Sequence, residues 1–255
     1  MKKYLEQLHS KRVFHFEDIS NMTENANTAK DLLLNYKRKN LIVKIRRDLY
    51  SVTELSSKAT IANKFEIGSN ISLSSYISYH SAFEYHGIAN QVFYDLYISS
   101  ETRFNDFDFE GIHYSYCNSI IDMGIETNSV NSLIRVTNLE RTVIDCIDRI
   151  DRAGGLEELI QCLAMLRFLD EDKLIEYLSK YNKIFLYKKV GFVLDVFKEE
   201  LKLSNNFIDL CHKKGHAHVK YLTDNSESDT FNKYWNIYAP KDILSYLEQG
   251  NNEFV

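Results

Sequence analysis

The chain has 255 residues and a formal net charge of −5, with 44% hydrophobic and 13% aromatic residues. That length favours two domains, and the apolar content is enough for packed cores, which excludes a disordered chain. No apolar run is long enough to span a bilayer, and the first residues, MKKYLEQLHSKR, lack the apolar core of a signal peptide, so a soluble cytoplasmic protein is expected.

The positions of the cysteines indicate whether the protein relies on disulfides or on bound zinc. Cys117, Cys146, Cys162 and Cys211 lie far apart and form no CxxC pair. This spacing argues against a disulfide framework or a zinc knuckle and favours reduced thiols in a cytosolic setting.

Charge is distributed unevenly along the chain. Residues 1–55 hold eleven Lys and Arg against seven Asp and Glu, so this segment carries +4, whereas the remainder carries −9. A cationic N-terminal segment on an acidic body is typical of a DNA-binding domain joined to a domain with a separate role.

Three short helices are predicted in this cationic segment. The first covers Met1–Ser10 and the second His15–Ile19, with a tight turn at Ser20–Met22. Thr23 and Asn25 can each cap the third helix, because their side-chain oxygens can accept from its orphan backbone N–H groups.

The third helix is expected to run to about Lys39 with one apolar face. Ala29, Leu32, Leu33 and Tyr36 recur at three- and four-residue steps, which places them on one side. The opposite side offers polar and charged residues, namely Asn27, Thr28, Lys30, Asp31, Lys37 and Arg38.

Two apolar runs after this helix predict a β-hairpin. Leu41–Ile45 and Leu49–Val52 are joined by Arg46, Arg47 and Asp48, so two arginines lie at its tip. Helices followed by a cationic hairpin are typical of a winged helix-turn-helix. In that fold one helix enters the major groove and the tip reaches phosphate or the minor groove.

The residue types of this segment predict which side chains would contact DNA. Asparagine pairs with adenine, threonine contacts the thymine methyl group, and lysine reaches guanine or phosphate. Base contacts are therefore expected from the start of the helix, at Asn25, Asn27, Thr28 and Lys30. Phosphate or minor-groove contacts are expected from Lys37, Arg38, Lys44, Arg46 and Arg47.

The rest of the chain is predicted to be a larger α+β domain with a mixed sheet and a helical bundle. Residues 53–68 form a linker, so a boundary near Thr60 divides the chain into 1–59 and 60–255. A strand is expected at Ile71–Ser75, a helix at Tyr76–Gly87, and a helix capped by Asn138 later on. Further strands are expected at 91–99, 111–117 and 132–137, with a closing pair in HVKYLTD and YWNIYAP.

Several groups of polar residues resemble chemical sites but lack a feature that such a site requires. Asp106 and Asp108 resemble a magnesium-binding carboxylate pair, but no nucleotide-cradling turn accompanies them. The histidines between Cys211 and His218 lack the spacing of a zinc helix. Asp145, Asp148 and Asp151, interleaved with arginines, are interpreted as a solvated, ion-paired helix face. His80 and His86 lack a nucleophile partner, and DNSESD at 224–229 lacks the glycine of a calcium loop. No metal and no cofactor is therefore expected.

Several stretches, taken in order, resemble one family. LIVKIRRDLYSV is similar to its wing, and ISLSSYISYHSAFEYHGIANQVFYDLYIS to the opening of its second domain. SLIRVTNLERTVIDCID resembles its most distinctive run, and GGLEELIQCLAML, LYKKVGFVLDVF and HVKYLTD…YWNIY continue the order. The family is the AbiE-type abortive-infection antitoxins, transcriptional regulators of bacterial type IV toxin–antitoxin systems. One departure is Asp48, where the family has glycine, although aspartate tolerates the left-handed conformation.

The resemblance implies a non-enzymatic protein with two roles. Its N-terminal winged helix would bind operator repeats in double-stranded DNA upstream of its own operon and repress it. Its C-terminal domain would oppose a nucleotidyltransferase-like toxin without a stable complex, as part of phage resistance. Two rivals remain open, namely a winged-helix repressor that senses a small ligand and a metal-dependent nucleotidyl-transferring enzyme that uses Asp106 and Asp108.

Overall fold

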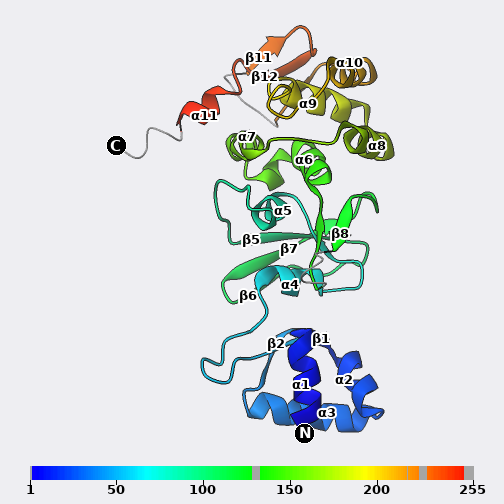
Figure 1. The fold of residues 1–255 in the computed structure, drawn as a ribbon, viewed down its shortest axis with the longest axis vertical. Helices are drawn as coiled ribbons and strands as arrows, with labels where there is room; N and C mark the ends of the chain where they lie inside the picture. Colours follow the sequence, from blue (N-terminus) through cyan, green and yellow to red (C-terminus); the bar gives the residue numbers. More distant parts are fainter. Residues whose placement is uncertain (1, 128–132, 217, 224–228, 250–255) are drawn as a thin grey trace. The chain divides into compact units, whose positions relative to one another are not determined.

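The computed structural model describes residues 2–127, 133–216, 218–223 and 229–249 (Figure 1). The fold is α+β, with a mixed sheet and many helices, as the sequence predicts. None of the helices in the described ranges combines the length and the apolar character that a membrane crossing requires.

The chain forms two compact units. The first comprises Met1–Ile77, Tyr94–Asn118 and Thr127–Val136, and the second comprises Ser78–Phe93, Ser119–Glu126 and Thr137–Val255. The division at 59/60 stays a prediction, because the first 77 residues belong to one unit together with two later segments.

The first unit begins with three helices and a small antiparallel sheet. These elements are α1 (Lys2–Lys11), β1 (Val13–His15), α2 (Phe16–Thr23), α3 (Ala26–Arg38), β2 (Ile42–Arg46) and β3 (Leu49–Val52). The three predicted helices and the hairpin are therefore present. Strand β1 was not predicted. It pairs with β3, placing Val13 opposite Ser51, so the strand order is β1-β3-β2.

The link between α2 and α3 differs from the prediction. The turn expected at Ser20–Met22 is wrong, because α2 continues to Thr23 and ends at Glu24, whose φ of 55° is left-handed. The Thr23 hydroxyl donates to the Ile19 carbonyl over 2.9 Å, so Thr23 is bound to its own helix. Asn25 alone caps α3.

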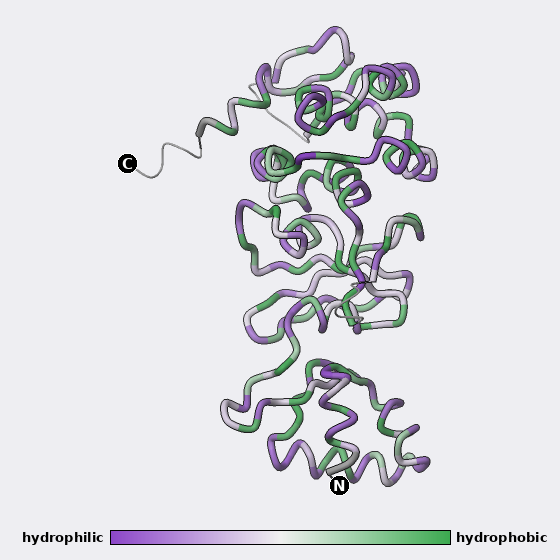
Figure 2. Tube along the Cα trace, in the orientation of Figure 1, coloured by the Kyte–Doolittle hydropathy of each residue, from purple (hydrophilic) through white to green (hydrophobic). Residues whose placement is uncertain are grey.

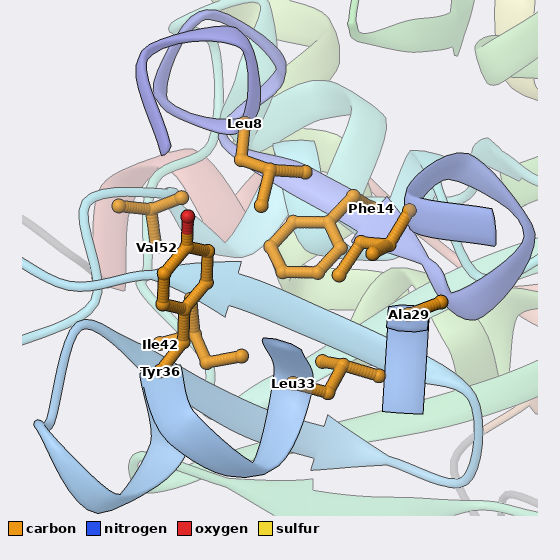
Figure 3. Close-up of a cluster of buried hydrophobic side chains, with 8 residues drawn as sticks. Leu8, Phe14, Ala29, Leu33, Tyr36, Ile42 and Val52 are labelled. Atoms are coloured by element: carbon orange, nitrogen blue, oxygen red, sulfur yellow. The ribbon is translucent and has the colours of Figure 1, made fainter. Parts of the chain in front are cut away.

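An apolar core joins these helices to the hairpin. Figure 3 shows Ala29, Leu33 and Tyr36 of α3 directed toward Leu8 of α1 and Phe14 of β1, which confirms the predicted apolar face. Along the helices the chain alternates between hydrophobic and hydrophilic residues (Figure 2). That alternation is expected of helices that bury one face and leave the other in water.

Asp48 shapes the hairpin turn. Its φ of 62° is left-handed, a conformation that aspartate tolerates better than most residues do. Its carboxylate accepts the backbone N–H of Phe16 over 3.1 Å, which ties the hairpin turn to the start of α2. The side chain therefore offsets the backbone cost through a hydrogen bond that glycine cannot make.

Asp48→Ala is expected to lower the free energy of unfolding by about 1–2 kcal/mol, because it loses this bond and keeps the left-handed φ. Asp48→Gly should lower it by less, since glycine adopts that φ without strain. Urea unfolding measures both values. Equal losses in the two variants would contradict this account of the turn.

A six-stranded mixed sheet follows helix α4 (Lys64–Ser69). Its order is β6-β7-β5-β4-β9-β8, with parallel pairing between β5 and β7 and between β4 and β9. Its strands are β4 (Tyr76–Ile77), β5 (Asp95–Ser100), β6 (Phe107–Phe109), β7 (Ile112–Asn118), β8 (Ile125–Thr127) and β9 (Arg135–Thr137). A Cβ at Gly68 of α4 would lie 2.9 Å from side-chain atoms of Ile77 and Leu96, so glycine permits this close packing.

Two sequence predictions in this region are wrong. Ile71–Ser75 forms a turn in which the Ser75 N–H donates to the Ser72 carbonyl over 3.1 Å, so the strand starts only at Tyr76. Serine hydroxyls compete in this way with strand pairing. The helix expected at Tyr76–Gly87 is the shorter α5 (His80–Tyr85). Of the strand expected at 132–137, β9 covers the last three residues, and Ser132 lies outside the described residues.

The second unit is mainly helical. Its helices are α5, α6 (Leu139–Asp148), η1 (Ile150–Ala153), α7 (Leu156–Met165), α8 (Glu171–Tyr181), α9 (Ile184–Asp195), α10 (Asn205–Lys214) and α11 (Ser245–Gln249). A small sheet of order β10-β12-β11 is formed by β10 (Lys220–Tyr221), β11 (Asp229–Asn232) and β12 (Ile237–Pro240). The predicted cap is confirmed, since Asn138 accepts the backbone N–H of Arg141 over 3.0 Å.

Candidate nucleic-acid interface

The start of α3 is held by Asn25. The side-chain oxygen of Asn25 accepts the backbone N–H groups of Asn27 over 2.9 Å and Thr28 over 3.1 Å. A bidentate contact to adenine needs the oxygen as well as the NH₂ group of the amide. Because the cap occupies this oxygen, Asn27, which is exposed, is better placed than Asn25 to read a base.

The face of α3 opposite the core is exposed and carries three cations, Lys30, Lys37 and Arg38. Its buried residues, Ala29, Leu33 and Tyr36, all belong to the core face. Asp31 is the one acid among the exposed charged side chains of this helix. Within α3, the exposed residues that the sequence assigned to DNA are Asn27, Thr28, Lys30, Lys37 and Arg38.

These cations have no acidic partner within the described part of the chain. The ion pairs of the N-terminal segment join Lys11 to Asp18, Arg12 to Glu66 and the His15 ring to Asp48. By contrast, no ion pair among the described residues includes Lys30, Lys37, Arg38, Lys44 or Arg47. A cluster of uncompensated cations on one helix and hairpin produces a positive potential that attracts polyanions.

The two arginines at the hairpin differ in their surroundings. Arg47 lies in the turn and is exposed, as is Lys44. Arg46 is half-buried, and its guanidinium carbon lies 5.3 Å from the ring centre of Phe104 and 4.9 Å from that of Phe107. Burial also lowers the pKa of Arg46. The structure therefore places Arg47, and not Arg46, at the open tip.

Asp106 and Asp108 are both engaged in hydrogen bonds. The Asp106 carboxylate accepts the backbone N–H of Tyr116 over 2.8 Å, and the Asp108 carboxylate accepts from the His113 ring over 2.8 Å. This hydrogen bond to Asp108 raises the pKa of His113. Phe107 packs on Tyr114 with ring centres 4.7 Å apart. Aspartate and phenylalanine alternate along residues 106–109, so the aromatic rings pack on the sheet and the carboxylates face water. This alternation stabilises the hairpin of β6 and β7 at the edge of the sheet.

A different polar cluster, which the sequence did not indicate, is the group in the described residues that could hold a metal ion. It contains His80, Glu158 and Cys162, all buried, with ligand atoms within 4.8 Å of one another. Glu158 Oε1 accepts from the His80 ring over 2.9 Å and from the backbone N–H groups of Asn90 and Gln91, each over 3.0 Å. In the sequence, the signal that could have indicated this cluster is a glutamate and a cysteine four residues apart on the apolar helix α7.

The hydrogen bonds of Glu158 account for its burial without a metal. Burial raises its pKa, but the bonds from His80, Gln91 and Cys162 outweigh this, so the net pKa lies below the ordinary value. Two backbone N–H donors point at the oxygen that a cation would need. The cluster is therefore a carboxylate anchor that joins α7 to the 90–91 loop.

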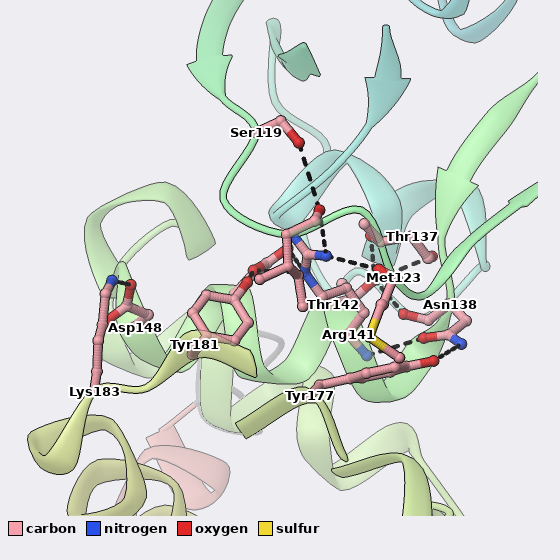
Figure 4. Close-up of polar contacts among 12 residues, drawn as sticks. Ser119, Met123, Thr137, Asn138, Arg141, Thr142, Asp148, Tyr177, Tyr181 and Lys183 are labelled. Carbon is pink, nitrogen blue, oxygen red and sulfur yellow. Dashed lines mark hydrogen bonds and ion pairs between the residues drawn. The ribbon is translucent and has the colours of Figure 1, made fainter. Parts of the chain in front are cut away.

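The run that carries the family resemblance forms a buried polar network (Figure 4). Arg141 is 1% exposed, and its Nε donates to both carboxylate oxygens of Asp145, over 3.0 and 2.9 Å. Its Nη1 donates to the carbonyls of Ile121 over 3.1 Å and Met123 over 2.7 Å. The Tyr181 hydroxyl also donates to Asp145.

This network corrects the interpretation of Asp145 as part of a solvated face. Asp145 is 2% exposed, while Arg149 and Asp151 form the exposed ion pair that was expected, over 2.6 Å. Burial raises the pKa of Asp145 to about 6, although Arg141 acts in the opposite direction. Arg141, Asp145 and Tyr181 therefore form a buried structural network within the second unit.

The histidine-rich stretch is also divided by the fold. Cys211 is buried on α10, and burial raises its pKa to about 12. The His212 ring donates to the Tyr234 carbonyl over 2.9 Å, whereas His216 and His218 are exposed. Of the acidic run at 224–229, all but Asp229 lies outside the described residues.

Comparison with known proteins supports the fold. No family model matches the chain, and no curated protein matches it. Among solved structures, the crystal structure of the RV2827C protein from Mycobacterium tuberculosis is similar, with a TM-score of 0.67 at 12% sequence identity. The match covers 98% of this chain and 94% of the other. At this identity the likeness concerns the fold alone.

Proposed function

We propose that residues 1–59 form a winged helix-turn-helix that binds double-stranded DNA. The observation that carries this proposal is the row of uncompensated cations, Lys30, Lys37 and Arg38, on the exposed face of α3. The hairpin of β2 and β3 adds Lys44 and Arg47 beside that helix. An exposed helix with polar residues at its start and a cationic hairpin after it matches the way such domains contact the major groove and its flanking phosphates.

We further propose that the protein represses its own operon and serves as the antitoxin of a type IV system. This part rests on the resemblance to the AbiE-type family in the order of the sequence stretches. The acidic remainder of the chain would then act separately from the DNA-binding segment, opposing a nucleotidyltransferase-like toxin without a stable complex. This proposed role is non-enzymatic, and it gives Asp106 and Asp108 a structural part in an edge hairpin.

Binding of the purified protein to its own promoter DNA, measured across a salt series, tests the DNA-binding proposal. The affinity should fall linearly on a logarithmic scale with salt, with a slope of about −0.9 for each phosphate contact. Footprinting should show protection over repeated sequences. Absence of both protection and salt-dependent binding at low ionic strength would refute the proposal.

Co-expression tests the antitoxin part separately. The neighbouring nucleotidyltransferase-like gene should arrest growth alone and not together with this chain. A full-length variant that no longer binds DNA should still protect, because residues 60–255 are proposed to carry the antitoxin role. Failure to protect would remove the antitoxin role and leave DNA binding untouched.

A further inference from the structure

A bulge near the tip of the hairpin sets the direction of Arg46. In the pairing of β2 with β3, Lys44 lies opposite Tyr50 and Arg46 opposite Leu49, with a shift of register between Lys44 and Arg46. In a regular strand, residues two apart point to the same side, so Lys44 and Arg46 would share one face. A bulge inserts one residue and re-aims the side chain that follows. Lys44 is accordingly exposed, whereas Arg46 is half-buried.

Arg46 meets a cluster of aromatic rings that belongs to the same compact unit. Phe104 is 8% exposed, and its ring centre lies 5.2 Å from that of Tyr116. Phe107 stacks on Tyr114 with an interplanar angle of 4°. Tyr114 and Tyr116 of β7 thus hold the two phenylalanine rings in place without any contribution from Arg46. The fixed rings offer a flat aromatic surface on which a planar guanidinium can stack.

The hydrogen-bonding state of Arg46 also differs from that of a phosphate contact. Its Nη1 is buried and has no hydrogen-bond acceptor within the described residues. A guanidinium that binds phosphate must direct its N–H groups at the anion, usually two at a time. At Arg46 one of the two terminal nitrogens is enclosed, and the guanidinium lies over two rings.

We propose that Arg46 is a positioning residue, which fixes the hairpin on Phe104 and Phe107 so that Arg47 alone carries the phosphate contact at the tip. The inference rests on the proposed DNA-binding function and assigns different roles to two adjacent arginines. The hydrogen bond from the Thr60 hydroxyl to Glu110, over 2.7 Å, ties the same segments of the unit together at a second point.

Hydrogen exchange of the free protein tests, without DNA, whether the contact of Arg46 with Phe104 and Phe107 fixes the hairpin. The variants are Arg46→Gln, Phe107→Leu and the double variant, with Arg47→Gln as the matched control. Amide exchange in residues 42–52 should rise about two- to fivefold in Arg46→Gln and in Phe107→Leu, the factor expected when a partly exposed cation–π contact is lost. The double variant should show no more than Arg46→Gln alone, because the contact that Phe107→Leu removes is one of the two that Arg46→Gln removes. The Arg47→Gln control should match the parent protein.

Salt-dependent DNA binding then separates the two roles. Arg47→Gln should reduce the salt slope by about 0.9. Arg46→Gln should weaken binding without changing the slope, as should Phe107→Leu, which removes no charge and keeps the contact of Arg46 with Phe104. A slope reduced equally by both arginine variants, or unchanged exchange in Arg46→Gln, would overturn the proposal. If the parent protein binds no DNA, the proposed function fails. The exchange experiment still decides whether Arg46 fixes the hairpin on Phe104 and Phe107.

Discussion

Replacing Arg141 by leucine is expected to lower the free energy of unfolding by about 3–5 kcal/mol, because it leaves a buried carboxylate without its cationic partner. The change leaves the Asp145 carboxylate buried with one hydroxyl donor, from Tyr181, in place of the guanidinium. It also removes the donor to the carbonyls of Ile121 and Met123. The total free energy of unfolding of a protein domain is about 5–15 kcal/mol, so the variant should be marginally folded.

Urea unfolding followed by circular dichroism measures this loss, and Arg149→Gln is its matched control. Arg149 also pairs with an aspartate, but the two side chains are 46% and 57% exposed. Exposed ion pairs contribute about 0–1 kcal/mol, so the control should unfold almost as the parent does. Equal losses in the two variants would show that burial of the Arg141 network does not matter to stability.

The loss in Arg141→Leu should also depend on pH. Burial raises the pKa of Asp145 to about 6 in the folded protein, and removing Arg141 removes the main influence that lowers it. A carboxyl whose folded pKa exceeds the unfolded value, about 3.9, binds its proton more tightly when folded, so its protonation favours folding. The difference between parent and variant should therefore shrink as pH falls from 8 toward 5. A difference that grows in this window would contradict the assignment.

Replacing Lys30, Lys37 and Arg38 together by glutamine is expected to weaken promoter binding by several hundredfold at about 0.1 M salt. Each phosphate contact contributes a salt slope of about 0.9, which corresponds to a factor of about eight at that concentration. The three substitutions should therefore reduce the salt slope by up to about 2.7. All three side chains are exposed, so the fold should be unaffected.

A triple variant of the second unit is the control for this experiment. Arg167, Lys180 and Lys202 are exposed cations there, and their replacement by glutamine changes the net charge by the same amount. Affinity within about twofold of the parent is expected, because charges away from the interface act only through a screened field. Similar losses in both triple variants would mean that net charge, and not the α3 face, determines binding.

Local sequence patterns were sufficient for the elements that depend on neighbours along the chain. The steps between Ala29, Leu33 and Tyr36 predicted the buried face of α3, and Asn25 and Asn138 predicted two helix starts. Side-chain periodicity and capping act within about four residues, so the sequence contains the whole cause.

The burial of charged residues could not be derived in the same way. Arg141 and Asp145 alternate with other charges as Arg149 and Asp151 do, yet one pair is buried and the other exposed. What separates them is the chain that covers the first pair, from Ile121, Met123 and Tyr181. Those residues are distant in sequence, so no local pattern distinguishes the two cases.

The amino-acid sequence by itself therefore determined the α+β class, the order of helices and hairpin in the N-terminal segment, and the face of α3 that carries polar and charged residues. Only the tertiary structure decided that β1 joins the hairpin, that Glu158 is an anchor, and that Arg46 turns to Phe104 and Phe107 while Arg47 stays in water. The physical reason is that hydrophobic spacing is a local property. The surroundings of a charge, in contrast, are set by contacts that form when distant segments pack together.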